Sequence, residues 1–277
     1  MTTIRHNQTA QFNTTQLRLI PGLHVALVAS PLEKGGSSIY AWETYQACRV
    51  AGVPAILATF DQGRRFPDIG RDLHRVAVDG KASGIEVLGC LLPIMREAEA
   101  AGKLLIIDTK ANLRDQMIEA LVYSGIHQAA SVAALIPIGR GLPSIYGAAV
   151  ACDAFRAADI PLARGLFRTW GPYRKIGSFG IPGVPRIESW VAKNLSPGAL
   201  ASIRNVGRIA EVPLDLFPAV MGSRKCGGAL KPSEEVRLHM LSAADAIRAA
   251  ILEPICEVCS TEARATLSFR KDGTIAG

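Results

Sequence analysis

Residues 23–42 read LHVALVASPLEKGGSSIYAW, a succession of elements that is typical of a phosphate-binding loop. Leu23 to Ala29 form an apolar run with the composition of a buried strand. A short turn, Lys34-Gly35-Gly36-Ser37-Ser38, follows this run, and a helical pattern begins near Tyr40. A strand, a glycine turn and a helix N-terminus direct backbone N–H groups and the positive end of a helix dipole toward one point. The stretch therefore predicts a site for a phosphate group.

The same loop departs from an ordinary P-loop in two residues. In the pattern G-x-x-x-x-G-K-[ST], the lysine reaches the β- and γ-phosphates and the hydroxyl binds Mg²⁺. Ile39 and Tyr40 stand where we expect this lysine and this hydroxyl residue. Ser37 or Ser38 lies close enough in the chain to supply the hydroxyl instead. The sequence thus predicts a P-loop whose usual lysine is missing.

The length of the chain fits one large α/β domain or two small ones, and we expect one because no Gly- and Pro-rich stretch is long enough to link two large units. The chain has 277 residues, of which 49% are hydrophobic, enough to form a substantial core. No run of about eighteen uncharged apolar residues occurs, and the polar N-terminus lacks a signal segment, so we expect a cytoplasmic protein. Six scattered cysteines fit reduced thiols better than a disulfide framework. We expect a flexible N-terminal arm over residues 1–20, one domain over residues 21–257 and a C-terminal tail over residues 258–277.

The net charge of +7 indicates an anionic partner without identifying it. Arginine and lysine gather in several stretches, at Arg64, Arg65, Arg71 and Arg75 and between residues 164 and 208. A basic face of this kind serves DNA or a phosphorylated ligand, or it is simply solvated. The charge alone leaves these alternatives open.

Short apolar runs alternate with helical patterns along most of the chain. Runs that predict strands lie at residues 23–29, 53–60, 104–107, 131–138, 161–167 and 209–214. Helical patterns lie at residues 39–51, 84–101, 112–124, 143–158, 186–194, 197–205 and 234–254. Strands that alternate with helices of this length form βαβ units. We therefore expect an α/β fold with a doubly wound, mostly parallel sheet flanked by helices, whose strand carboxyl ends meet at one edge.

Two of the predicted strands end in aspartate. Asp108 follows the run LLII at residues 104–107, and Asp61 follows the run AILATF. A carboxylate at such a strand end is placed to hold the shell of a Mg²⁺ ion beside bound phosphates, because this cation prefers oxygen ligands. Each aspartate also has a structural interpretation, Asp108 as a cap of the next helix and Asp61 as a turn residue.

The three strand ends, in this order, resemble the motifs of the ParA/MinD family of deviant Walker A P-loop ATPases. This family includes plasmid-partition and conjugal-transfer members. Lys34-Gly35-Gly36 matches the family's K-G-G, whereas Ser38, Ile39 and Tyr40 depart from its following Gly, Lys and Ser/Thr. Residues 59–65, TFDQGRR, match D-x-D-x-G-x-R except that Thr59 replaces the first Asp. Asp108-Thr109-Lys110-Ala111 matches D-x-P-A apart from Lys110.

The resemblance extends over most of residues 23–254. AALIPIGRGLPSIYGAAVACDAF is similar to a later strand, loop and helix of the family. RGLFRTWGP lies where the family's next strand leads into its adenine pocket, and EVPLDLFP resembles a late turn of the family. Each motif is loose on its own, and their collinear order is what indicates the family.

The resemblance implies a nucleotide-dependent dimer that binds ATP or ADP with Mg²⁺. Lys34 and Asp61 would be the catalytic residues, Lys34 by contacting the phosphates of the partner subunit's nucleotide and Asp61 by orienting the attacking water. Residues Lys34, Gly35, Gly36, Ser37, Ser38 and Asp108 would bind the cofactor, and Asp108, Ser37 and Ser38 would hold the Mg²⁺ ion. The family also implies a homodimer that engages DNA or a DNA-bound partner protein.

Two functions follow, which ATP turnover would separate. The first is an ATPase switch in plasmid maintenance, partition or conjugal mobilisation, with hydrolysis weakened by the missing lysine. The second is a catalytically inactive pseudo-ATPase that serves as a DNA- or partner-binding scaffold. A dinucleotide-dependent dehydrogenase would require G-x-G-x-x-G, and the loop offers only Gly35 and Gly36. Cys256 and Cys259 have the spacing of half a zinc site, without a second pair at matching spacing.

Overall fold

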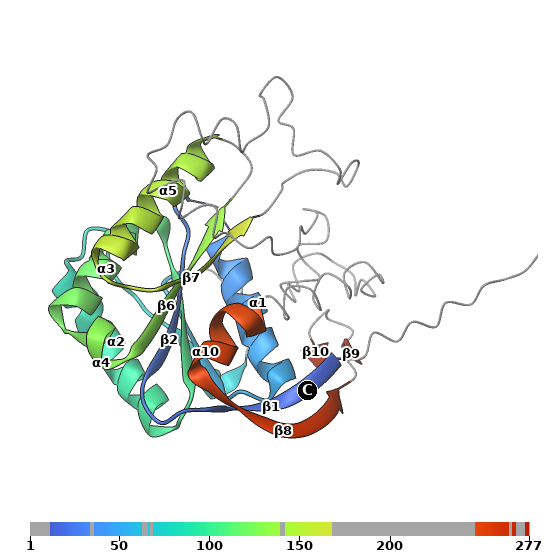
Figure 1. Cartoon of the computed structure of the whole chain (residues 1–277). Coiled ribbons are helices and arrows are strands. Elements are labelled where there is room, and N and C mark those ends of the chain that lie inside the picture. Colours follow the sequence, from blue (N-terminus) through green and yellow to red (C-terminus); the bar gives the residue numbers. More distant parts are fainter. Residues whose placement is uncertain are drawn as a thin grey trace, which may run out of the picture.

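The structure is a computed structural model, and it describes residues 12–33, 36–62, 66, 69–138, 142–167, 247–265, 268–269 and 275–276. Its main sheet contains β2 (His24–Ala29), β3 (Ala55–Thr59), β4 (Leu73–Arg75), β5 (Leu104–Thr109), β6 (Ser131–Ile138) and β7 (Leu162–Phe167). The strands are parallel and their order is β4-β3-β5-β2-β6-β7, so β2 is central (Figure 1). Because β5 and β6 flank β2, the winding reverses there, which confirms the predicted doubly wound sheet.

Helices cover both faces of this sheet (Figure 1). They are α1 (Ser37–Ala51), η1 (Gly70–Asp72), α2 (Gly84–Ala100), η2 (Ala111–Leu113), α3 (Arg114–Tyr123), α4 (Ile126–Ala129), α5 (Leu142–Ala157), η5 (Arg248–Leu252) and α10 (Glu253–Ile255). Alternate side chains of each strand point to opposite faces. Val25 and Leu27 pack with α2, α3 and α5, whereas Ala26 and Val28 pack with α1 and residues 247–255. The core therefore has two layers, and α1 defines the face on which the candidate site lies.

Most of the predicted elements of the described residues are present. The apolar runs form β2, β3, β5, β6 and β7, and the helical patterns form α1, α2, α3 and α5. The short elements β4 and α4 were not predicted, since three or four residues show no periodicity. The strand predicted at 209–214, the helices at 186–194 and 197–205, and most of the helix at 234–254 lie outside the described residues. No helix within the described ranges is long and apolar enough to cross a membrane.

An antiparallel ribbon joins β1 (Phe12–Leu19) to β8 (Cys256–Ala265) beside α1 and α10 (Figure 1). This corrects the predicted division of the chain, because residues 12–19 form a strand and β8 runs across the boundary expected at residue 257. Leu17 is 2% exposed and packs into the core layer on the α1 face, so the ribbon is held by the domain itself. A second, smaller ribbon pairs β9 (Ser268–Phe269) with β10 (Ile275–Ala276).

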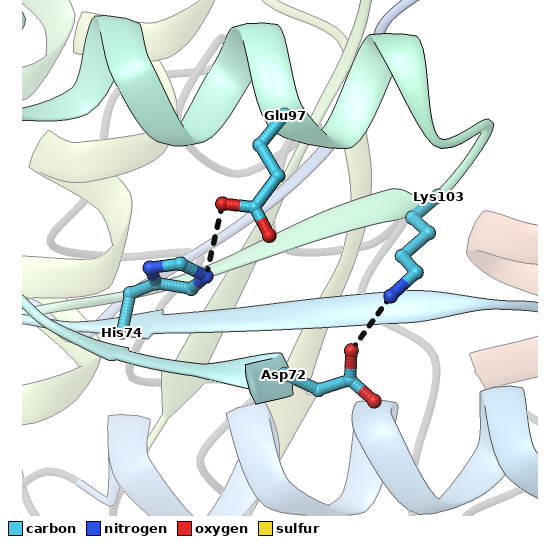
Figure 2. A network of polar contacts seen from close by, with 4 residues as sticks. All are labelled: Asp72, His74, Glu97 and Lys103. Atoms are coloured by element: carbon cyan, nitrogen blue, oxygen red, sulfur yellow. Dashed lines mark hydrogen bonds and ion pairs between the residues drawn. The ribbon is translucent and has the colours of Figure 1, made fainter. Parts of the chain in front are cut away.

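An ion pair and a histidine–carboxylate contact lie at the β4 edge of the sheet (Figure 2). The Lys103 ammonium lies 2.8 Å from the Asp72 carboxylate, and the His74 ring lies 3.6 Å from the Glu97 carboxylate. Both pairs connect the start of β4 to the end of α2 and the turn before β5. Their carboxylates are 35% and 48% exposed, so each pair contributes about 1 kcal/mol at most. Burial, followed by the Asp72 charge, raises the pKa of Tyr45, which packs from α1 toward this edge.

Candidate functional site

Gly36 starts the α1 helix in a conformation that favours glycine. Its backbone has φ of 90° and ψ of 15°, in the left-handed region where a Cβ atom is strained. The Gly36 carbonyl accepts hydrogen bonds from the N–H groups of Ile39 and Tyr40, at 3.0 and 3.2 Å. The first N–H groups of a helix have no partner within the helix and attract anions. The structure thus places a helix N-terminus directly after β2, as the loop sequence predicts.

Ser38, Thr59 and Asp108 meet at the carboxyl edge of the sheet. Thr59 and Asp108 are register partners at the ends of β3 and β5. Thr59 and Asp108 each lie two residues after a residue that packs on the α1 face, Leu57 and Ile106, and so point to that same face. Their side chains therefore lie next to each other beneath the first turn of α1. The Ser38 and Thr59 hydroxyls each donate a hydrogen bond of 2.9 Å to Oδ2 of Asp108. The first turn of α1 and the ends of β3 and β5 therefore meet at one edge of the sheet.

The Asp108 carboxylate is buried, at 1% exposure, and only one of its oxygens is satisfied. Oδ1 has no hydrogen-bond partner among the described residues. Burial raises the pKa of Asp108, the hydroxyls of Ser37, Ser38 and Thr59 lower it, and the charge of Asp61 raises it further. A buried carboxylate oxygen without a donor is unfavourable unless a ligand supplies the missing interaction. Oδ1 and the nearby serine hydroxyl are hard oxygen donors, a set that suits Mg²⁺.

Ile39 and Tyr40 do not take part in the site. Their side chains are 1% and 2% exposed and lie in the core layer between α1 and the sheet. The hydroxyl that contacts the strand-end carboxylate is that of Ser38, two residues before Tyr40. With Ser38 in the hydroxyl position of G-x-x-x-x-G-K-[ST], Gly36 occupies the second glycine position and Ser37 the lysine position. The geometry therefore selects the serine alternative that the sequence left open.

Asp61 lies at the rim of this cluster. It is half-buried, and its backbone N–H donates a hydrogen bond of 3.0 Å to the Thr59 hydroxyl. Its charge is close enough to raise the pKa of Asp108. Lys34 and Gly35 lie outside the described residues, and so do residues 63–65.

Other residues singled out from the sequence are not brought to this edge. Cys256 is buried at the start of β8, and the thiol of Cys259 lies outside the described side chains. Among the described residues, no three His, Cys, Asp or Glu side chains gather where they could hold a metal ion. Of the basic stretches, Arg71 and Arg75 lie exposed at the β4 edge, while Arg64, Arg65 and residues 168–208 are outside the described ranges.

Solved structures of ATPases have a similar fold. The cell division ATPase MinD from Pyrococcus furiosus aligns with a TM-score of 0.50 at 12% identity, over 82% of this chain and 99% of that one. A ParA family ATPase from Chlorobium tepidum gives a TM-score of 0.49 at 10% identity, over 80% and 99% of the two chains. MinD from Aquifex aeolicus gives 0.48 at 14% identity, over 80% and 95%. The chain has a P-loop fold of the MinD/ParA type.

At such identities the likeness extends to the fold and not to the activity. No protein-family model matches the sequence, and a comparison with curated proteins gave no significant match. The function has to be inferred from the residues of the site itself.

Proposed function

We propose that this chain is a nucleotide-dependent switch protein of the ParA/MinD type, with weak ATP hydrolysis, that acts in plasmid maintenance, partition or conjugal DNA mobilisation. The observation that supports it best is the unsatisfied, buried Oδ1 of Asp108 beside a glycine-capped helix N-terminus. A helix start attracts phosphate, and a carboxylate oxygen beside it attracts the cation that accompanies a nucleotide. Both features occur at the carboxyl edge of the central strand, where α/β folds bind ligands.

In this proposal each residue of the cluster has a role set by its position. The N–H groups of Gly36, Ser37 and Ser38 face the phosphates of ATP or ADP. Asp108 and Ser38 hold Mg²⁺, which neutralises phosphate charge when it is bound, with Ser37 as a further oxygen donor. Lys34 contacts the phosphates of the partner subunit's nucleotide in a homodimer. This role rests on the K-G-G resemblance alone, since the register set by Ser38 puts Leu32 at the position of the family's first lysine.

Asp61 acts on the water that attacks the terminal phosphate. Its backbone N–H bonds to the Thr59 hydroxyl, which also bonds to Asp108, and its charge is close enough to raise the pKa of Asp108. An aspartate placed there orients water and accepts its proton as the new bond forms. The water oxygen would bond to the terminal phosphorus as the bond from that phosphorus to the bridging oxygen breaks. The water's proton would pass to an Asp61 oxygen, and the products would be ADP and inorganic phosphate.

Hydrolysis is weak because the lysine position carries a serine. A cation at that position stabilises negative charge as it develops, and such preorganised groups contribute about 3–4 kcal/mol to a transition state. Ser37 supplies no charge in its place. The same observation favours the second function, a pseudo-ATPase that binds nucleotide or partner and does not turn over.

The proposed partners follow from charge and from the switch mechanism. A net charge of +7 favours DNA or a DNA-bound protein, and DNA contacts made by lysine and arginine weaken steeply with salt. The dimer would form with nucleotide and separate after hydrolysis.

Binding and turnover of ATP with Mg²⁺, measured side by side on the full chain, test this function. We expect wild type to bind a fluorescent ATP analogue only with Mg²⁺ and to hydrolyse ATP slowly, and we expect Lys34→Ala and Asp61→Ala to abolish hydrolysis. Asp153→Ala and Arg156→Ala provide matched controls, since they remove an exposed pair at the far end of α5. Binding without turnover in wild type would select the scaffold function. An absence of Mg²⁺-dependent binding would refute the nucleotide site.

A further inference from the structure

Thr59 connects the two carboxylate-bearing strand ends of the site. It is fully buried at the end of β3, and its hydroxyl makes two hydrogen bonds. It donates to Oδ2 of Asp108 at 2.9 Å and accepts from the backbone N–H of Asp61 at 3.0 Å. A hydroxyl has one donor hydrogen and two acceptor lone pairs, so both bonds form at once. The direction of each bond is fixed, because an N–H only donates and a carboxylate only accepts.

Two hydrogen bonds, one from Ser38 and one from Thr59, set the orientation of the Asp108 carboxylate. Ser38 and Thr59 approach the same oxygen, Oδ2, from α1 and from β3. Their donation to one oxygen leaves Oδ1 as the oxygen that is available to a ligand. The Thr59 hydroxyl also starts the turn after β3, because it holds the Asp61 backbone.

The residue type at position 59 also sets the charge of the site. The D-x-D-x-G-x-R motif that this segment resembles has a carboxylate at this position. A carboxylate there would lie about 3 Å from the Asp108 carboxylate in a buried position, where two like charges are strongly unfavourable. Within the described part of the chain, no lysine or arginine pairs with Asp108, and Ser37 occupies the lysine position. Threonine keeps the bridge and omits the second negative charge.

We propose that Thr59 is a positioning residue that orients Asp108 and matches the charge of the site to a loop that has serine at position 37, where the motif has lysine. In this proposal, two differences from the family motifs compensate each other in charge. Position 59 lacks the carboxylate, and position 37 lacks the cation. The Ser37 hydroxyl affects the pKa of Asp108, so a longer side chain at position 37 reaches the same carboxylate. The role in ligand orientation rests on the proposed nucleotide site, whereas the charge matching is a property of the folded chain alone.

Thermal unfolding of the full chain without nucleotide tests the charge matching through four variants. Thr59→Asp and Thr59→Asn have side chains of the same size, and only the first adds a charge. We expect the Thr59→Asp midpoint to lie about 5 °C or more below that of Thr59→Asn at pH 7, as for a buried like-charge pair in a domain of this size. When each is combined with Ser37→Lys, the difference should fall by half or more. An equal difference in both backgrounds, or none in either, would overturn the proposal.

Two further variants test the hydroxyl bridge. Thr59→Ser keeps the hydroxyl and should retain the wild-type midpoint within about 2 °C, whereas Thr59→Val keeps the shape and should lower it, because the Asp61 N–H loses its acceptor. A Thr59→Val midpoint equal to that of Thr59→Ser would refute the bridge. These measurements need no ligand, so they decide the inference even if wild type fails to bind ATP, an outcome that would refute the proposed function alone.

Discussion

Replacing Asp108 with asparagine should stabilise the ligand-free protein and remove its response to Mg²⁺ and ATP. The substitution keeps the shape of the side chain and removes its charge. Burial raises the pKa of Asp108 in the folded chain above its ordinary value of 3.8. A carboxyl group whose folded pKa is raised favours folding at low pH, and this contribution is lost as the pH rises through the folded pKa. At pH 7 the ionised Asp108 therefore opposes folding.

The magnitude follows from the site and from the size of the chain. Relief of a destabilising functional group typically adds about 0.5–2 kcal/mol to the free energy of unfolding. In a domain of this size, 1 kcal/mol corresponds to a midpoint shift of about 2–4 °C. Bound Mg²⁺ and ATP at about 100 times their dissociation constant should stabilise wild type by about 2.7 kcal/mol and leave Asp108→Asn unchanged. The two proteins should thus exchange their order of stability when the ligand is added.

Urea unfolding at several pH values, with and without Mg²⁺ and ATP, measures both effects. The ligand-free advantage of Asp108→Asn should shrink as the pH falls through the raised folded pKa of Asp108. It should be gone well below the ordinary value of 3.8, where the carboxyl group is protonated in both states. Asp72→Asn is the matched control, since its carboxylate is half-exposed and its pair with Lys103 contributes little. If Asp108→Asn were less stable than wild type at pH 7 without ligand, Asp108 would be a structural acceptor for the two hydroxyls. The assignment of a ligand-binding role would then be refuted.

Three further predictions concern the core, the thiols and the ribbon. Phe155 is fully buried, so Phe155→Ala should lower the free energy of unfolding, measured by urea titration, by about 3–5 kcal/mol, and Phe155→Leu should lower it by much less. Equal losses would contradict tight packing at this position. Exposed Cys90 should react with iodoacetamide at pH 8 well before buried Cys48 and Cys152, because burial blocks both thiols and raises the pKa of Cys152 to about 11. Mass spectrometry measures the three rates, and comparable rates would contradict this prediction. Leu17→Asp should raise amide hydrogen exchange in β8 by about tenfold or more, since it places an unpaired charge in the core; unchanged exchange would show that the ribbon is not anchored through this residue.

The apolar runs of the sequence predicted the parallel sheet because its strands are buried on both faces. The run at residues 131–138 coincides with β6, and LLII at residues 104–107 lies within β5. Strands of this kind read as continuous apolar segments. The ribbon strand β1 has the sequence FNTTQLRL, in which polar residues outnumber apolar ones and a bulge between Thr15 and Leu17 interrupts the alternation. Its position depends on pairing with β8, more than 200 residues away, as the register between Phe12 and Ala265 shows.

The candidate site was predictable in its strands and less so in its loop. Asp61 and Asp108 were identified because a carboxylate after an apolar run is visible in the sequence. The expectation at Ile39 and Tyr40 came from counting along a motif, whereas the structure is set by helical phase, which directs both side chains into the core. The role of Thr59 was missed because it was treated only as a lost aspartate. Its position two residues after Leu57, on the same face of β3, was the available signal.

The pattern of hydroxyls and charge in the site bears on the choice between a switch and a scaffold. A scaffold with no need of a cation would gain stability from an uncharged residue at position 108, because the surrounding Ser38 and Thr59 hydroxyls can pair with an amide as well as with a carboxylate. The chain instead keeps a buried carboxylate, one oxygen of which has no hydrogen-bond partner in the part of the chain that the structure describes. Features that lower stability without a packing role are characteristic of functional sites. The carboxylate at Asp108 therefore favours a bound cation. Under the proposed function, the serine at position 37 would lower the rate of hydrolysis without preventing the binding of that cation.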